Sequence, residues 1–386
     1  MTMHSSRHPI RRYAATLALV SLQACTSAYS YKEKAVPEAV KLSERLQMLF
    51  AKTKLICFGR YAMEVPQEAQ LLWGTAGIAG DVEIINGGLT ASQKRVAEDI
   101  AKIMHDSDTA EITYNREGPV EASWQIRYYE SDLDKKYKIH IFNTYVNKGE
   151  LTFILGGSVG QVDTEEVAAA KQGERAKSLR LRAADEVPDE SGYCIDHAFM
   201  ASKLYAEQET VNIGIYLPSL PDVAFSIGSN KDAYGDLPKQ EFEKSTRGKL
   251  SLLARIEAAK QDQGLFYPSR TVLREGKRDV QHWHGEESLI KRADGTHDFE
   301  WAFVGTPTDV ANPSEYNAVM FTKVEHNVVG AASAASVSDD EAVALWDRLL
   351  SGLKFRAKVP GAPEGSYYLA GDKPLLRSIT VATLNR

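Results

Sequence analysis

Apolar and polar residues in the first half of the chain follow two periods, one typical of strands and one typical of helices. Alternation, or a short apolar run, predicts strands at 55–66, 82–85, 124–128, 137–141 and 151–155. A wider spacing predicts helices at 37–52, from Thr90 to Met104, and at 164–182. Thr90 would cap the second helix, because Gln93 can close a capping box with it.

The second half repeats this order of elements. After a segment at 193–200, strands are expected at 211–217, 223–227, 280–284, 299–304 and 317–324. One helix carries Leu250, Leu253 and Ile256, and a last helix begins with a capping box of Ser338 and Glu341. The repeated order predicts an α+β fold of two domains with similar element order, each a mainly antiparallel sheet with packed helices.

The first 25 residues have the layout of a secretion signal. Basic residues precede an apolar run from Tyr13 to Leu22, which is too short to span a bilayer as a helix. The run closes in Leu-Gln-Ala-Cys, which resembles the lipobox of bacterial lipoproteins and implies that Cys25 is lipidated. Thr26, where an aspartate would favour retention at the inner membrane, indicates the outer membrane. An ordinary cleaved signal is the alternative.

Composition indicates a folded, mildly acidic protein. Hydrophobic residues make up 43% of the chain, which is enough for packed cores. About 350 residues would remain after removal of the signal, and this length favours two domains. Loss of Arg7, Arg11 and Arg12 with the signal changes the formal charge from −6 to −9. That charge argues against nucleic acid as a partner.

A polar, acidic stretch interrupted by Pro188 marks the expected domain boundary. The expected parts are a lipoprotein signal at 1–24, a tether and first helix at 25–50, an N-terminal domain at 51–184, an acidic linker at 185–192, a C-terminal domain at 193–357 and a C-terminal extension at 358–386. The linker acids could contact a partner and set the encounter rate, and they are Asp185, Glu186, Asp189 and Glu190. A solvated linker explains the same residues.

Two cysteines remain besides Cys25. In an oxidising compartment an even pair usually forms a disulfide, so we expect a bond between Cys57 and Cys194. Two separately buried small side chains are the alternative. The bond would close a very long loop, for which the chain-entropy model gives roughly 4 to 5 kcal/mol of stability.

A glycine-rich stretch at 156–160 fits the G-x-S-x-G motif, with Ser158 at its centre. In a lipase this serine lies on a tight turn between a strand and a helix, beside an acid and a base. Here the next helix begins near Thr164, too late for that turn, and no oxyanion stretch precedes the motif. A turn at the end of a strand explains the residues, and a periplasmic lipase or esterase that uses Ser158 is the alternative.

His282 and His284 stand two residues apart, so on a strand they would face one side and could bind a metal. Nothing supplies a third ligand at a recognisable spacing, so a solvated strand face is expected. His297 and Asp298 are interpreted as an isolated surface pair. With no phosphate loop or H-E-x-x-H motif either, the sequence predicts no metal, no cofactor and no catalytic site.

Three features carry a resemblance to a known family: Cys57-Phe58-Gly59-Arg60-Tyr61 followed by Val65-Pro66, Gly192-Tyr193-Cys194, and the lipoprotein leader. Over residues 50–357 the chain resembles the immunity proteins of type VI secreted phospholipase effectors, the Tli family. The resemblance implies two α+β domains that bind a toxic lipase in the periplasm and cover its active site. It transfers no catalytic residues, and the positions that match appear as structural ones: Cys57, Gly59, Arg60, Pro66, Gly192 and Cys194. His197 stands where the family has a small residue, often glycine.

The sequence therefore predicts a lipoprotein, anchored through Cys25 to the periplasmic face of the outer membrane, that inhibits a phospholipase toxin without being an enzyme. Its partners would be that effector and, through the lipid, the membrane. A general envelope-assembly lipoprotein is a further alternative. That alternative predicts binding to a resident envelope protein and no protection from a toxin.

Overall fold

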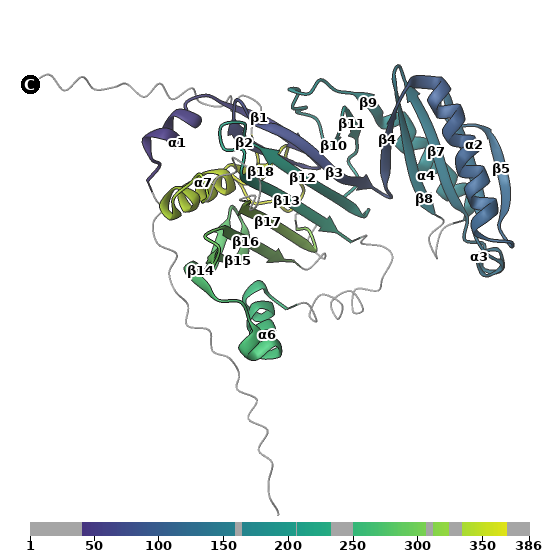
Figure 1. Cartoon of the computed structure of the whole chain (residues 1–386). Coiled ribbons are helices and arrows are strands. Elements are labelled where there is room, and N and C mark those ends of the chain that lie inside the picture. The colour runs from purple at the N-terminus through teal and green to yellow at the C-terminus, as the bar shows by residue number, and fades with distance from the viewer. Residues whose placement is uncertain are drawn as a thin grey trace, which may run out of the picture. The chain divides into compact units, whose positions relative to one another are not determined.

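A computed structural model describes residues 41–158, 164–205, 207–232, 250–305, 312–323 and 334–368, all within the compact unit Lys34–Arg386 (Figure 1). Cys25, the expected signal, most of the tether and the end of the expected C-terminal extension lie outside these ranges. None of the helices in these ranges combines the length and the apolar character that a membrane span needs.

The larger sheet has seven antiparallel strands. Their order across the sheet is β14 (Arg270–Val280), β15 (Trp283–Arg292), β16 (His297–Val304), β17 (Glu315–Thr322), β13 (Val223–Lys231), β12 (Glu209–Tyr216) and β3 (Gln70–Ile78). Strands of this kind bury alternate residues, as β13 does along its whole length.

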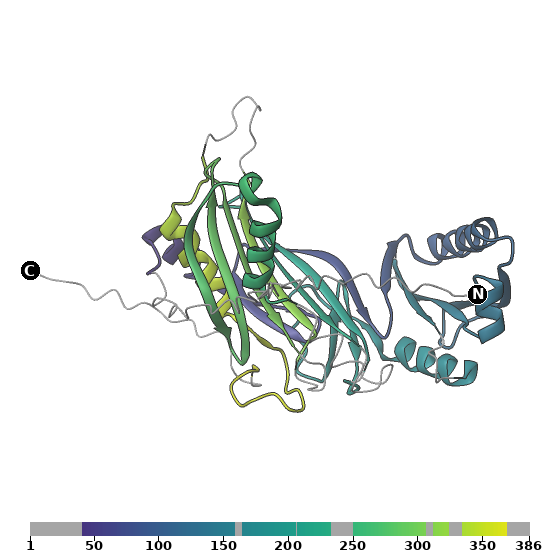
Figure 2. The same cartoon turned by 90° about the horizontal axis from the view of Figure 1, so that it is seen from below.

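Helices α7 (Asp339–Ser351) and α6 (Leu252–Gln263) pack on opposite faces of this sheet (Figure 2). Trp346 of α7 packs against Phe299 of β16, with ring centroids 6.0 Å apart. The next residue, Glu300, faces the other side and pairs with Arg255 of α6 at 3.0 Å. A short 3₁₀ helix, η1 (Gly264–Phe266), continues α6 towards β14.

The smaller sheet has five antiparallel strands, in the order β4 (Val82–Asn86), β8 (Leu151–Ser158), β7 (Ile141–Lys148), β6 (Ser123–Tyr129) and β5 (Glu111–Glu117). Helix α2 (Gly88–Asp106) packs its stripe of Val96, Ile100 and Ile103 on one face. Helix α4 (Glu165–Ser178) covers the other face, where Ala168 packs on Phe142. Helix α3 (Asp132–Tyr137) connects β6 to β7.

The two sheets share one topology. In the smaller sheet the order along the chain is β4, α2, β5 to β8 and α4, and in the larger sheet it is β13, α6, β14 to β17 and α7. In both sheets the strand before the first helix pairs with the last of the four later strands, so β4-β8-β7-β6-β5 corresponds to β13-β17-β16-β15-β14. The predicted α+β class and the predicted similarity of element order are confirmed.

Two three-stranded sheets complete the described fold. One contains β1 (Thr53–Phe58), β2 (Tyr61–Pro66) and β18 (Leu353–Phe355), and the other contains β9 (Leu179–Leu181), β10 (Gly192–Ile195) and β11 (Ala198–Ala201). Tyr61 stacks on Tyr316 of the larger sheet with centroids 4.7 Å apart. Helix α1 (Glu44–Leu49) is capped by the Ser43 side chain, and it covers only part of the helix expected at 37–52.

Strand pairing crosses the expected linker at 185–192. Ile78 of β3 is the register partner of Glu209 of β12, and Met63 of β2 is the partner of Leu353 of β18. The first strands of the chain therefore belong to sheets completed by its second half. The division into domains at 51–184 and 193–357 stays a prediction.

Three expected strands were wrong in detail, each because of a residue with positive φ. The strand at 55–66 is a hairpin, since Gly59 turns the chain with a φ of 51°. The strand at 137–141 is instead the connection from α3, which ends at Tyr137, to β7, which begins at Ile141, and Lys138 turns the chain there with a φ of 57°. The strand at 280–284 spans the end of β14, a two-residue turn and the start of β15, and Gln281 in that turn has a φ of 54°.

Helix boundaries also differ. Thr90 lies inside α2, whose N-cap is Gly87. The long helix expected to Arg182 ends at Ser178, because the chain then enters β9. The capping box of Ser338 and Glu341 is present at the start of α7 as predicted.

Candidate interaction surfaces

Ser158, the candidate nucleophile, is exposed at the end of β8 and pairs in register with Ile141. Directly opposed residues share a face of the sheet, so the preceding residue, His140, points to the other face. There His140 Nδ1 lies 3.5 Å from a carboxylate oxygen of Glu165, and burial against Tyr129 lowers the pKa of His140. The sheet therefore separates Ser158 from this base. Val159 and Gly160 of the motif lie outside the described residues.

The two histidines that were weighed as metal ligands, His282 and His284, have different surroundings. His284 is exposed and its Nδ1 lies 2.9 Å from Asp279. His282 lies in the turn before β15, with its ring 4.4 Å from that of Trp283. Within the ranges that the structure describes, no three His, Cys, Asp or Glu side chains gather in a way that could hold a metal ion.

His297 is buried, so its interpretation as a surface residue was wrong. The His297 Nε2 lies 2.9 Å from Asp339 at the start of α7, and the backbone N–H of His297 donates to the Thr322 hydroxyl at 2.8 Å. Thr322 Oγ1 is also 3.4 Å from His297 Nδ1, which gives a hydroxyl, an imidazole and a carboxylate in series. Thr322 is only 2% exposed, however, so no substrate reaches this hydroxyl. The group fastens α7 to the sheet.

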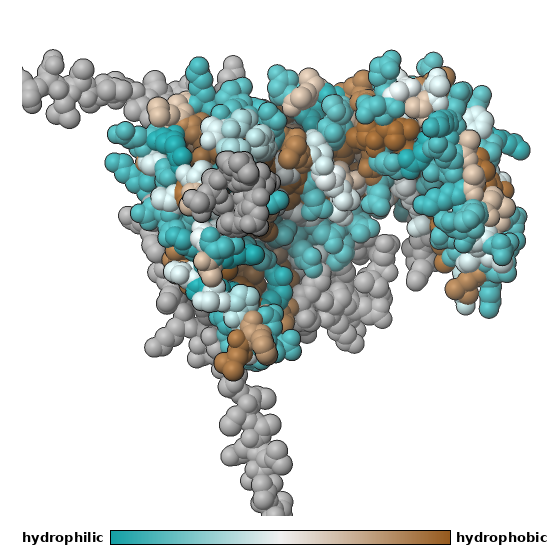
Figure 3. Space-filling view, in the orientation of Figure 1, coloured by the Kyte–Doolittle hydropathy of each residue, from teal (hydrophilic) through white to brown (hydrophobic). Residues whose placement is uncertain are grey.

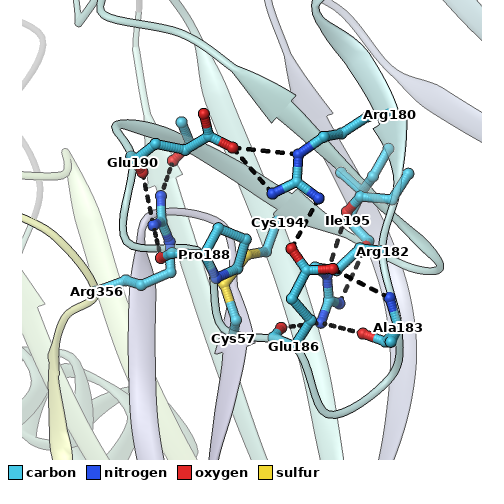
Figure 4. Close-up of a disulfide and its surroundings, with 12 residues drawn as sticks. Cys57, Arg180, Arg182, Ala183, Glu186, Pro188, Glu190, Cys194, Ile195 and Arg356 are labelled. Carbon is cyan, nitrogen blue, oxygen red and sulfur yellow. Dashed lines mark hydrogen bonds and ion pairs between the residues drawn. A yellow bond between two sulfur atoms is a disulfide. The ribbon is translucent and has the colours of Figure 1, made fainter. Parts of the chain in front are cut away.

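The expected disulfide between Cys57 and Cys194 is present (Figure 4). It joins β1 to β10 across 137 residues of sequence, with the Cα atoms 5.9 Å apart. Beside it, the buried guanidinium of Arg60 lies 2.6 Å from the Glu209 carboxylate and 4.2 Å from the centroid of the Tyr205 ring. A bond, an ion pair and a ring contact therefore hold the start of the chain to its second half.

The acidic linker is held in place by arginines (Figure 4). Arg180 pairs with Glu186 at 2.7 Å and with Glu190 at 2.9 Å, and its hydrogen bond lowers the pKa of Glu186. Arg182 donates to the Glu186 carbonyl at 2.8 Å, and Arg356 donates to the Glu190 carbonyl at 2.7 Å. Two of the four linker acids are thus engaged within the chain.

Asp185 and Asp189 are exposed. Along the linker these two aspartates alternate with Glu186 and Glu190, the two acids that pair with Arg180. Contact of the four acids with a partner stays a prediction.

A cavity of about 390 Å³ borders Ser158, and Arg175 and Gly157 also line it. Arg175 donates to the carbonyls of Gly156 at 2.7 Å and Gly80 at 3.2 Å. Burial lowers the pKa of Arg175 to about 10, although Glu207 and Asp81 act in the other direction. The arginine thus joins α4 to two backbone segments, which is a structural role.

The end of the α6 segment presents the most exposed large apolar side chains of the described ranges. Leu265 is 102% exposed and Phe266 is 92% exposed. Brown atoms at the lower edge of Figure 3, where Figure 1 places α6, mark this apolar surface. The expected sites did not include these residues. An apolar cluster directly after a helix that Gly264 ends was the available signal.

Sequence models of two adjacent domains match this chain. The Tle cognate immunity protein 4 N-terminal domain matches residues 54–187, and the Tle cognate immunity protein 4 C-terminal domain matches residues 186–358. Among curated protein sequences, none matches.

Solved structures of immunity proteins share the fold. The apo structure of immunity protein TplEi of T6SS from Pseudomonas aeruginosa has a TM-score of 0.60 and 23% identity, covering 78% of this chain and 97% of that one. The same immunity protein complexed with "L" peptide has a TM-score of 0.58 and 23% identity, covering 78% and 98%. The crystal structure of the Tle4-Tli4 complex has a TM-score of 0.61 and 24% identity, covering 78% and 97%.

Proposed function

The chain belongs to the Tle cognate immunity protein 4 family, and from this we propose that it binds a cognate type VI secreted phospholipase effector and covers the active site of that enzyme. The observation that carries the proposal is the match of both domain models, which run together from residue 54 to residue 358. The solved Tle4-Tli4 complex supports it, since a relative with this fold is found there with its partner.

Inhibition requires no chemistry from this chain. A protein that fills the opening of a lipid cleft excludes the substrate, and a near-permanent complex needs a contact of about 2,000 Å² or more. The positions of Ser158 and His140 on opposite faces of the smaller sheet, and the burial of Thr322, favour such a non-enzymatic role.

The proposed place of action is the periplasmic face of the outer membrane, reached through a lipid on Cys25. The Cys57–Cys194 disulfide supports an oxidising compartment. A tether near the membrane raises the effective concentration of an inhibitor where an injected phospholipase meets its substrate.

The test is protection from the effector encoded beside this chain. Cells without the chain are expected to die when sister cells deliver that effector, and to survive when the chain is restored. In solution, an equimolar amount of the purified chain is expected to abolish hydrolysis of phospholipid by the effector. Death of the restored cells, together with no binding between the purified proteins, would refute the proposal.

The lipid anchor has a separate test. Cys25→Ser is expected to leave binding to the purified effector unchanged and to weaken protection in cells. Equal protection with Cys25→Ser would remove the anchor from the proposal and leave inhibition in place.

A further inference from the structure

One face of the larger sheet carries a row of side chains that the fold covers only in part. Val272, Ile290, Asp298 and Phe321 are successive register partners on β14, β15, β16 and β17, so their side chains share a face. It is the face on which α6 lies, because Glu300, on the same side as Asp298, pairs with α6. Val272 is 47% exposed and Phe321 is 41% exposed. We name these four residues the α6-side row.

The apolar tip Leu265–Phe266 stands next to this row. A cavity of about 500 Å³ is lined by Gln263 and Tyr267, which flank the tip along the chain, and by Ile290 and Asp298 of the row. The tip, the cavity and the row therefore form one continuous surface.

The tip is held in a defined conformation. The N–H of Tyr267 donates to the Gly264 carbonyl at 3.2 Å, and the Arg270 guanidinium lies 4.7 Å from the centroid of the Tyr267 ring. Burial of a side chain such as leucine or phenylalanine stabilises a fold by about 1.5 to 3 kcal/mol, and this fold forgoes that gain twice at adjacent positions. Together with Val272 and Phe321 of the row, this pair forms an exposed apolar surface of the kind that marks a site for a partner.

We infer that the Leu265–Phe266 tip and the α6-side row dock into the apolar lipid-entry cleft of the effector, an inference that rests on the proposed function. An enzyme that hydrolyses phospholipids must open an apolar cleft to admit acyl chains. Two projecting apolar side chains fill such a cleft with a gain of free energy, because both surfaces leave water. The row then lies against the rim of the cleft.

The charges around the tip favour a protein cleft over an anionic bilayer. A bilayer surface attracts unpaired lysine and arginine. Here Arg292 is paired with Asp298, Arg270 lies over Tyr267, and the whole chain carries a formal charge of −6.

The area is too small for a second copy of this chain. If two tips met, the four side chains would together bury at most about 600 to 1,000 Å², below the roughly 1,200 Å² of a stable interface. A cleft that encloses the tip on all sides removes more of the surface of the same two side chains from water.

The test compares two double variants of the full chain. Leu265→Ser with Phe266→Ser removes the apolar tip. Leu133→Ser with Tyr137→Ser is the matched control, because both side chains are 61% exposed and lie on α3 of the smaller sheet. The purified effector encoded beside this chain is the probe, and affinity and inhibition of its phospholipase activity are both measured.

The tip variant is expected to bind at least about 30-fold more weakly, as loss of an interface anchor does, and to inhibit in proportion. The control variant is expected to stay within about 3-fold of the parent. Leu265→Met with Phe266→Trp keeps the apolar area and is expected to retain tight binding. All variants are expected to have the same melting temperature as the parent, since these side chains are exposed.

Equal binding by the parent and the tip variant would overturn the inference and leave the proposed function in place. A parent that does not bind the effector would instead overturn the proposed function. Binding to vesicles of phosphatidylethanolamine and phosphatidylglycerol that the tip variant alone loses, with effector binding unchanged, would assign the tip to a membrane.

Discussion

Gly59 and Cys194 each donate a backbone hydrogen bond to the carbonyl of the other, both at 2.8 Å, beside the disulfide that joins Cys194 to Cys57. A side chain at Gly59 would come within 2.9 Å of Val211 and 3.4 Å of Tyr193. The β1–β2 hairpin, β10 and β12 thus meet where only glycine fits. Covalent and hydrogen-bonded connections between the two halves of the chain coincide at this point.

Removal of the disulfide should cost much of the stability. With 137 residues of sequence between the cysteines, the chain-entropy model gives about 5 kcal/mol for the bond. Cys57→Ala with Cys194→Ala is expected to lower the free energy of unfolding in urea by that order. A reducing agent should lower the stability of the parent to the same value and leave the variant unchanged. A variant as stable as the oxidised parent would contradict the prediction.

Acid should weaken the attachment of α7 to the larger sheet. Burial would raise the pKa of Asp347, but hydrogen bonds from Arg274 at 3.0 Å and Arg278 at 2.7 Å outweigh it and hold that pKa below its usual value. A depressed carboxyl pKa adds stability above the unfolded value of about 3.9, and this stability is lost as the pH falls through the folded value.

Asp347→Asn tests this attachment. It leaves buried arginine charge uncompensated, so stability at neutral pH is expected to fall by about 3 to 5 kcal/mol. The variant should also lose less stability than the parent between pH 5 and pH 2, followed by urea unfolding at each pH. Parallel pH profiles for parent and variant would show that another carboxylate is responsible.

His197→Gly should stabilise the protein. His197 has a φ of 56° in the two-residue turn between β10 and β11, a conformation that costs an L-residue roughly 1 to 2 kcal/mol. Glycine adopts it freely but loses more entropy on folding, so a net gain of about 0.5 to 1 kcal/mol is expected. Thermal and urea unfolding measure it. Gly59→Ala, the converse change at a φ of 51°, should destabilise, and a loss of stability in both variants would refute the role of φ.

The exposed linker acids should affect the rate of association with the effector. Asp185→Lys with Asp189→Lys is expected to slow association with the effector several-fold at low salt, with less effect at high salt. Glu186→Gln with Glu190→Gln is the matched control, because Arg180 already pairs with both acids and surface pairs are each worth about 0 to 1 kcal/mol. Stopped-flow mixing gives the rates. Equal rates for all variants would make the linker a solvated segment only.

Local patterns predicted the elements whose signals are local. The capping box of Ser338 and Glu341 and the helix expected from Thr90 to Met104 required only neighbours within one helix, although Met104 itself is 50% exposed. Strand β3 was not predicted, because Gly74 and Gly77 interrupt its apolar pattern. Its partner, β12, lies far along the chain. Non-local pairing of this kind leaves little trace in sequence periodicity.

The apolar cluster after Gly264 was visible in the sequence, but its exposure could not be predicted, for a related reason. Ile256 and Leu265 are both apolar residues in or next to one helix, yet the first is partly buried and the second fully exposed. The sheet covers one of these two residues and not the other because of where α6 ends relative to β15 and β16. The burial of His297 was missed similarly, since its partner Asp339 lies on a distant helix.

The pairing of Ile78 with Glu209 has a consequence for how such proteins diversify. The N–H of Ala79 donates to the Gln208 carbonyl at 2.8 Å, so the chain leaves the seven strands and rejoins them at adjacent positions. The stretch between these two touching ends carries the five-stranded sheet together with β9, β10 and β11, and it forms a cassette. A lineage facing a new toxin could acquire a different cassette by recombination while its seven-stranded scaffold stays the same, provided that the cassette keeps a cysteine that can bond to Cys57.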